Sequence, residues 1–147
     1  MLLGRTQLTL DDKNRIVLPA TFRDSLHGPL YFALGDENQV GIWPEEAFQQ
    51  KLALKKEREL HGGPEGRREF IRFTANASPV KMDAQFRVPV PETLRTLARL
   101  DRSRPVAMIG VSDRVEIWDS ISFDAYVATP DEPALAASGL SGTGSAS

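Results

Sequence analysis

The sequence predicts an α+β protein, rich in β-strands, that is built from two copies of one small module. Residues 11–19 recur 72 positions later as residues 83–91, and both segments read Asp-x-x-x-Arg, a short apolar strand and Pro. Downstream, residues 40–43 recur as residues 115–118, 75 positions later. A module of roughly 50 ordered residues lies near the lower limit for an independent core. We therefore expect the two halves to pack on each other.

Each copy should open with a β-hairpin. Residues 8–10 alternate between apolar and polar side chains, and the turn at residues 11–14 contains Asp and Asn, which bond to their own backbone. Ile16 and Leu18 should then face the core, with Val17 on the other side. The second hairpin should place Val80, Met82, Val88 and Val90 inward and Pro89 outward. Because Pro removes a ladder donor, this strand should lie at an edge, a bulge or a rim.

A short helix, two strands and a closing helix should follow each hairpin. Pro19 and Pro91 are typical of a first helical turn, so we expect helices over residues 20–26 and 92–100. Their spacing predicts core-facing side chains at Phe22, Leu26, Leu94, Leu97 and Ala98. Buried strands are expected at residues 30–34 and 106–109, with hairpin partners at residues 40–43 and 115–118. The closing helices should begin near Pro44 and Asp119, because acidic residues there complement the helix dipole.

These elements divide the chain into four segments. Residues 1–60 form the first module with its closing helix, residues 61–78 a helical linker, and residues 79–128 the second module with its closing helix. Residues 129–147 are rich in Ala, Ser, Gly and Pro, so we expect a disordered tail there.

The composition argues against an enzyme. The chain has no Cys, which excludes disulfides, thiol nucleophiles and thiolate metal sites. Its two histidines lie in loop-like contexts without a nucleophile motif, and no phosphate-binding loop or metal-ligand spacing is present. We expect no catalysis, no cofactor, no metal and no small-molecule substrate. The absence of a signal-like or membrane-spanning segment favours a cytoplasmic protein.

The Asp/Arg turn is the residue pattern with a chemical role, and two interpretations of it remain open. In the structural interpretation, Asp11 and Asp83 accept turn N–H groups and pair with Arg15 and Arg87. In the functional interpretation, a carboxylate orients the Arg at the rim of the hairpin. The planar guanidinium is then positioned to donate two hydrogen bonds to a phosphate or to guanine.

Additional basic residues favour the functional interpretation. We expect Arg5, Lys13 and Arg23 to cluster with Arg15 in the first copy, and Arg95 and Arg99 to lie near Arg87 in the second. The formal charge of −2 argues only weakly against a nucleic-acid partner, because basic groups can gather on one face.

The paired motifs resemble the MraZ family of bacterial transcriptional regulators, which is associated with the division and cell-wall gene cluster. The resemblance rests on the tandem Asp-x-x-x-Arg motifs, on residues 8–15 and on residues 109–119, and it covers residues 1 to about 128. It implies two AbrB-like swapped-hairpin repeats that form one pseudo-two-fold β-barrel with flanking helices. It also implies a closed ring homo-oligomer that binds repeated elements in double-stranded promoter DNA and is nucleoid-associated.

The resemblance and the basic clusters together give a set of site residues. The predicted DNA-binding residues are Arg15, Lys13, Arg87, Arg5 and Arg23, and the residues that orient the turns are Asp11, Asn14 and Asp83.

The second motif departs from the family, which usually has Gly before the motif Arg. Asn14 occupies this position in the first copy and Phe86 in the second. Asn tolerates a positive φ, so the first turn should survive, whereas Phe does not adopt it cheaply. We therefore expect a reshaped second turn. Gln85 also replaces the charge of Lys13, so the second copy should contribute less to DNA binding.

A second class of function is also consistent with the residues. AbrB-like modules serve as protein-interaction units, either antitoxin-like or scaffolding, and the Asp/Arg turns would then support structure or subunit contacts. The location of the arginines separates the two functions, because a DNA-binding protein exposes Arg15 on a shared basic rim and a scaffold buries it.

Overall fold

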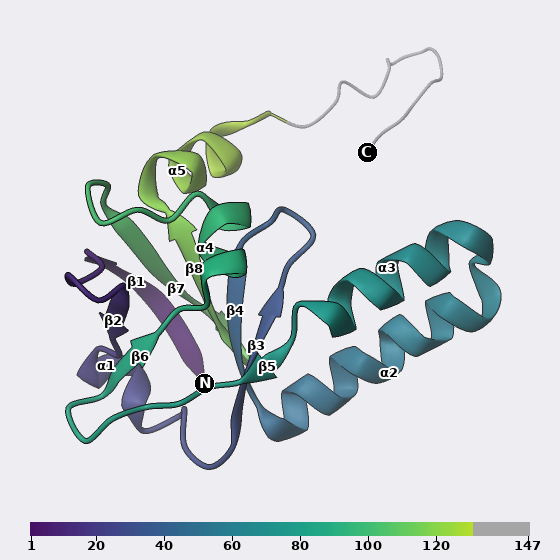
Figure 1. Ribbon diagram of the computed structural model, residues 1–147, viewed down its shortest axis with the longest axis horizontal. Helices are drawn as coiled ribbons and strands as arrows, with labels where there is room; N and C mark the ends of the chain where they lie inside the picture. Colours follow the sequence, from purple (N-terminus) through teal and green to yellow (C-terminus); the bar gives the residue numbers. More distant parts are fainter. Residues whose placement is uncertain (131–147) are drawn as a thin grey trace.

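The computed structural model describes residues 1–130 and contains a six-stranded sheet, a two-stranded ribbon and five helices (Figure 1). Every neighbouring pair of strands is antiparallel. The order in the large sheet is β1 (Leu2–Leu8), β7 (Val106–Ser112), β8 (Val115–Asp119), β4 (Val40–Pro44), β3 (Leu30–Leu34) and β5 (Ser78–Pro79). The ribbon pairs β2 (Arg15–Val17) with β6 (Arg87–Pro89). The helices are α1 (Ala20–Arg23), α2 (Glu45–His61), α3 (Gly63–Ala75), α4 (Glu92–Ala98) and α5 (Ser120–Ala128).

The strand register relates the two copies by an approximate two-fold axis. In the β2–β6 ribbon, Ile16 lies opposite Val88, its own counterpart in the repeat. In the large sheet, Gly41 on β4 lies opposite Glu116 on β8, which is again its counterpart. The first strand of each copy also pairs with the other copy, β1 with β7 and β5 with β3. The two copies are therefore interleaved rather than arranged side by side.

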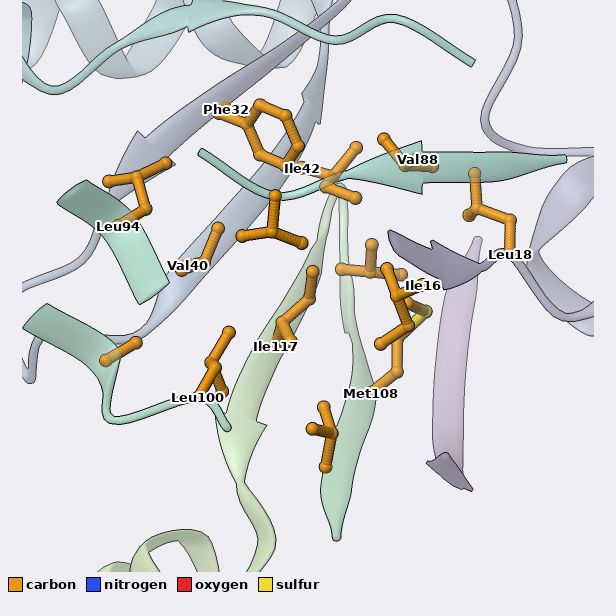
Figure 2. Close-up of a cluster of buried hydrophobic side chains, with 14 of the residues drawn as sticks. Ile16, Leu18, Phe32, Val40, Ile42, Val88, Leu94, Leu100, Met108 and Ile117 are labelled. Carbon is orange, nitrogen blue, oxygen red and sulfur yellow. The ribbon is translucent and has the colours of Figure 1, made fainter. Parts of the chain in front are cut away.

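A single hydrophobic core lies between the large sheet and the ribbon. Ile16, Leu18 and Val88 of the ribbon are fully or almost fully buried, and both copies contribute to the same cluster. Full burial of one such aliphatic side chain stabilises the fold by about 1.5–3 kcal/mol. Figure 2 shows that strands of both halves and helix α4 contribute to the cluster; its labelled members are Ile16, Leu18, Phe32, Val40, Ile42, Val88, Leu94, Leu100, Met108 and Ile117.

The opposite face of the large sheet carries the two repeat-related tryptophans. Trp43 lies in a second cluster with Phe48 of α2 and Phe73 of α3, whose rings stack with centroids 5.7 Å apart. Trp118 packs against Phe123 of α5, with ring centroids 5.4 Å apart. Both tryptophans are buried, as a core role predicts. The α2–α3 hairpin extends from this side of the sheet (Figure 1).

The fold class and most elements match the sequence prediction, but the closed barrel does not. Within residues 1–130 the large sheet has two free edges, β1 and β5, and the β2–β6 ribbon forms a separate sheet. The physical reason is visible in the strands themselves. β5 has only two residues and ends at Pro79, and β6 has three and ends at Pro89. The proline in each strand removes one ladder donor, and each strand pairs with a single neighbour, β5 with β3 and β6 with β2, so the described strands do not close into a barrel.

Several details of the prediction were wrong. Leu97 is 38% exposed, because α4 is only two turns long and its buried stripe runs through Leu94 and Ala98. Met82 is also exposed, because the chain leaves the sheet after Val80, whose amide still donates to the Leu30 carbonyl at 2.9 Å. The first short helix ends at Arg23 rather than at residue 26, and the second ends at Ala98 rather than at residue 100. Most of the predicted disordered tail, residues 131–147, lies outside the described residues.

Candidate functional site

The first Asp/Arg turn is closed by the carboxylate of Asp11. Asp11 Oδ1 accepts hydrogen bonds from the backbone amides of Lys13 at 2.9 Å and Arg15 at 2.8 Å. Asp11 Oδ2 accepts a third bond from Arg15 Nε at 2.8 Å. The backbone amide of Asn14 donates to the Asp11 carbonyl at 3.0 Å, and Asn14 has a φ of 60°. Asn14 thus supplies the left-handed residue that the turn requires.

The second turn repeats the first bond for bond. Asp83 Oδ1 accepts from the amides of Gln85 and Arg87, each at 2.9 Å, and Asp83 Oδ2 accepts from Arg87 Nε at 2.7 Å. The amide of Phe86 donates to the Asp83 carbonyl at 3.0 Å, and the φ of Phe86 is 62°. The prediction of a reshaped second turn is therefore wrong. The strain of a left-handed Phe, about 1–2 kcal/mol, is offset by the hydrogen bonds that Asp83 collects.

Both carboxylates are stabilised in their charged form. The backbone amide of Arg15 is the largest cause that lowers the pKa of Asp11, and the amide of Arg87 does the same for the pKa of Asp83. Each charged carboxylate binds the guanidinium of its arginine through Nε, in addition to the backbone amide of the same arginine. Among the described residues, neither Arg15 nor Arg87 has a protein acceptor for its two terminal nitrogens, and these side chains are 22% and 33% exposed. The hydrogen bonds and ion pairs of the structural interpretation are present in both turns, and within residues 1–130 the two terminal nitrogens of each guanidinium have no protein acceptor.

Across the β2–β6 ribbon, the arginine that follows the Asp/Arg turn of one copy lies beside the turn of the other copy. Arg23 Nε donates to the Leu18 carbonyl at 2.8 Å, and the Leu18 amide donates to the carbonyl of Phe86 at 2.8 Å. The Arg23 guanidinium lies 4.0 Å from the centre of the Phe86 ring. Arg23 therefore stands beside the second turn, and the predicted cluster of Arg23 with Arg15 is wrong. The position of Arg23 could not be predicted from the sequence, because the sequence does not show which strands pair.

Arg95, the repeat counterpart of Arg23, lies beside the first turn. Arg95 Nε donates to the Val90 carbonyl at 2.9 Å, and the Val90 amide donates to the carbonyl of Asn14 at 3.2 Å. Arg102 also reaches the first turn, where its Nη1 donates to the Asp12 carbonyl at 2.9 Å. Arg102 was missed by sequence analysis, because it lies 90 positions from Asp12 and outside the repeated motif.

Two other predicted basic residues lie elsewhere. Arg5, on β1, pairs with Asp124 of α5 at 2.7 Å and donates to the Ser120 hydroxyl at 2.9 Å, so it fastens α5 to the sheet. The expectation that Arg5 clusters with Arg15 is also wrong, because the position of Arg5 depends on strand pairing, which the sequence does not show. Arg99 ends α4 with a φ of 59° and lines a hollow with Asn38 and Ser122, so it is not beside Arg87.

The comparison with known proteins assigns the family. Residues 1–65 and 73–138 match the family model described as "MraZ protein, putative antitoxin-like". This chain belongs to the MraZ family. The resemblance seen in the tandem motifs is thereby confirmed.

Three similar MraZ proteins illustrate the extent of the match, and each is named transcriptional regulator MraZ. The protein of Clavibacter michiganensis subsp. michiganensis is 36% identical over 137 residues, which cover 92% of both chains. That of Kineococcus radiotolerans is 39% identical with the same coverage. That of Salinispora arenicola is 37% identical over 134 residues, 90% of this chain and 91% of its own.

Metal-binding clusters and membrane spans are not found in the described part of this MraZ family member. Within residues 1–130, no three His, Asp or Glu side chains gather in a way that could hold a metal ion. His61 lies 3.4 Å from Glu57 on an exposed face of α2. Over the same residues, none of the helices has the length and apolar character needed to cross a membrane.

Proposed function

We propose that this chain is a sequence-specific regulator of transcription that binds double-stranded DNA through its two Asp/Arg turns. The observation that carries the proposal is the matched pair of guanidiniums, Arg15 and Arg87, each fixed at Nε and each with two terminal nitrogens that no acceptor within residues 1–130 binds. A planar donor fork of this kind suits bidentate bonding to guanine O6 and N7 or to a phosphate. The name shared by the relatives supports the same function.

We assign different roles to the basic residues according to what each side chain contacts. Arg15 and Arg87 would contact bases or phosphates, and the exposed Lys13 would contact a phosphate next to the first turn. Arg23 would support DNA binding at the second turn, beside which it lies. Arg95 and Arg102 would support DNA binding at the first turn. We assign Arg5 to the attachment of α5, because its guanidinium is occupied by Asp124 and Ser120.

The proposal includes a closed ring of identical subunits. With a net charge of −2, one monomer offers few cations to DNA, and several linked turns would raise the affinity without new contacts. The promoter of the division and cell-wall gene cluster, with short repeated elements, is the proposed target, and the cytoplasm with its nucleoid is the proposed location. Residues 1–60 and 79–128 would be the two AbrB-like modules, joined by residues 61–78.

A second candidate function is a protein-interaction module of the antitoxin-like kind. The description of the matching family model favours it. In this case the Asp/Arg turns would hold the backbone for a protein partner, and the terminal nitrogens of Arg15 and Arg87 would meet protein carboxylates rather than nucleic acid.

A mobility-shift assay with the duplex upstream of the protein's own gene tests the proposal. The full chain should retard this duplex at lower concentrations than a scrambled duplex of equal length, and the shift should weaken as salt is raised. Equal retardation of the two duplexes would contradict sequence-specific binding. No retardation at low salt would contradict DNA binding and favour the interaction module.

A further inference from the structure

Phe86 is a residue that the backbone of its turn does not require. The first turn makes the same hydrogen bonds with Asn14, at a φ of 60° compared with 62° for Phe86. A residue with a bulky aromatic side chain is an outlier in this conformation. Burial does not explain it either, because Phe86 is 38% exposed. The strained position therefore presents an aromatic ring at the tip of the turn that neither the backbone hydrogen bonds nor burial requires.

The ring is held in place by the other copy of the repeat. The guanidinium of Arg23 lies 4.0 Å from the ring centre, a distance typical of a cation–π contact. Arg23 is in turn fixed by its bond to the Leu18 carbonyl, and Leu18 is bonded to the backbone of Phe86. One side of the ring thus has a rigid support, and part of the ring remains exposed to solvent.

We propose that Phe86 is a specificity-determining residue that contacts the 5-methyl group of a thymine in the major groove, with Arg23 as the residue that positions its ring. This inference rests on the proposed DNA binding. The thymine methyl is the apolar group that the major groove offers, and Phe is among the side chains that contact it. Arg87, one residue away, would supply the polar contact to a neighbouring base or phosphate.

The two turns would then read different bases. Asn14 presents an amide at the position where Phe86 presents a ring, and an amide recognises adenine rather than a methyl group. A protein with two-fold related turns would therefore recognise an element that is not itself symmetric. The difference lies in the side chains of Asn14 and Phe86, because Arg23 and Arg95 make equivalent backbone bonds beside the second and the first turn.

Uracil scanning of the duplex upstream of the protein's own gene tests the inference, because uracil lacks only the methyl group. Each thymine is replaced singly, and the dissociation constants of the wild-type chain and of Phe86→Asn are compared. The wild-type chain should lose about fourfold in affinity at one or more positions, as expected for the removal of one buried methyl group. Phe86→Asn should bind the unmodified duplex about fourfold more weakly and should show no further decrease with uracil at those positions.

A matched pair of arginine variants tests the positioning role. Arg23→Ala should reduce the discrimination between thymine and uracil at the same positions. Arg95→Ala removes the repeat counterpart, which makes the equivalent carbonyl bond but has no aromatic neighbour among the described residues, so any loss of affinity should be the same for the thymine and the uracil duplexes and their ratio should not change.

The outcomes separate this inference from the proposed function. Wild-type binding that is insensitive to uracil at every position would overturn the role of Phe86 and leave DNA binding intact. Equal decreases with uracil in the wild type and Phe86→Asn would also overturn it, as would a change of oligomeric state in Phe86→Asn by light scattering. Failure of the wild-type chain to bind any duplex would overturn both.

Discussion

Ile16 and Val88 lie opposite each other at the centre of the β2–β6 ribbon, although each is the other's counterpart in the repeat. Both side chains are completely buried in the shared core. The same ribbon carries the two Asp/Arg turns at its opposite ends, since Arg15 opens β2 and Arg87 opens β6. The geometry of the two turns therefore depends on both copies at once.

A fragment of residues 1–62 should not fold as a stable monomer. It would lack β7 and β8, which pair with β1 and β4, and β6, which pairs with β2. A segment of this size has little core of its own without its partner. Circular dichroism and thermal unfolding of the fragment and the full chain provide the measurement. A cooperative transition in a monomeric fragment would show that the copies are independent.

The stability of the chain should fall in acid through Asp119. This buried carboxylate pairs with Arg104 at 2.7 Å, which is the largest cause that lowers the pKa of Asp119 to about 2. Because its folded pKa lies below the unfolded value, the stabilisation is present above about pH 4 and disappears as the pH falls towards 2. The full contribution is about 2 kcal/mol.

Urea unfolding of Asp119→Asn and the wild type at pH 6 and pH 2 measures this effect. The difference in unfolding free energy should be large at pH 6 and should shrink by about 2 kcal/mol at pH 2. Asp113→Asn is the control, because Asp113 forms an ion pair at a more exposed position, with Arg114. A difference that does not change with pH would show that Asp119 acts through packing alone.

The sequence predicted local structure better than it predicted which residues contact each other across the fold. The repeat located both turns, and the roles of Asp11 and Asp83 in closing them followed from the hydrogen-bonding habits of Asp. The strand at Leu30–Leu34 agrees with the residue pattern, because an apolar run and turn residues mark it locally.

The positions of the flanking arginines could not be predicted, because they depend on strand pairing. Arg23 and Arg95 each lie beside the other copy's turn, and periodicity does not encode that exchange. The conformation of Phe86 was missed for a different reason. Residue preferences argue against a left-handed Phe, and the tertiary bonds of the turn override them.

Lys13→Ala should weaken binding to all duplexes by a similar factor. Lys13 is exposed in the first turn, and a lysine of this kind contacts phosphates rather than bases. The slope of log affinity against log salt should decrease in magnitude by about 0.9 for each phosphate that the variant no longer neutralises. Gln85→Lys places the same charge in the second turn and should steepen the slope. A reduced specificity with an unchanged slope in Lys13→Ala would contradict the phosphate role.

Arg15→Ala should weaken specific DNA binding more than Arg87→Ala. The two turns have the same backbone, so the difference comes from their surroundings: Lys13 and Arg102 add charge at the first turn, and neutral Gln85 stands at the second. Removal of one good base contact costs about 1–3 kcal/mol, and a ring of subunits multiplies the effect. Dissociation constants for the specific and scrambled duplexes measure it.

Both arginine variants require a check of fold and assembly, because each arginine also pairs with the aspartate that closes its turn. Arg15→Lys and Arg87→Lys are the matched controls, since Lys keeps the charge but not the planar fork. If the fork reads bases, Arg15→Lys should have a reduced specificity while retaining most of its affinity for the scrambled duplex. Equal decreases for the two alanine variants, or intact binding by Arg15→Ala, would show that the Asp/Arg turns serve structure alone.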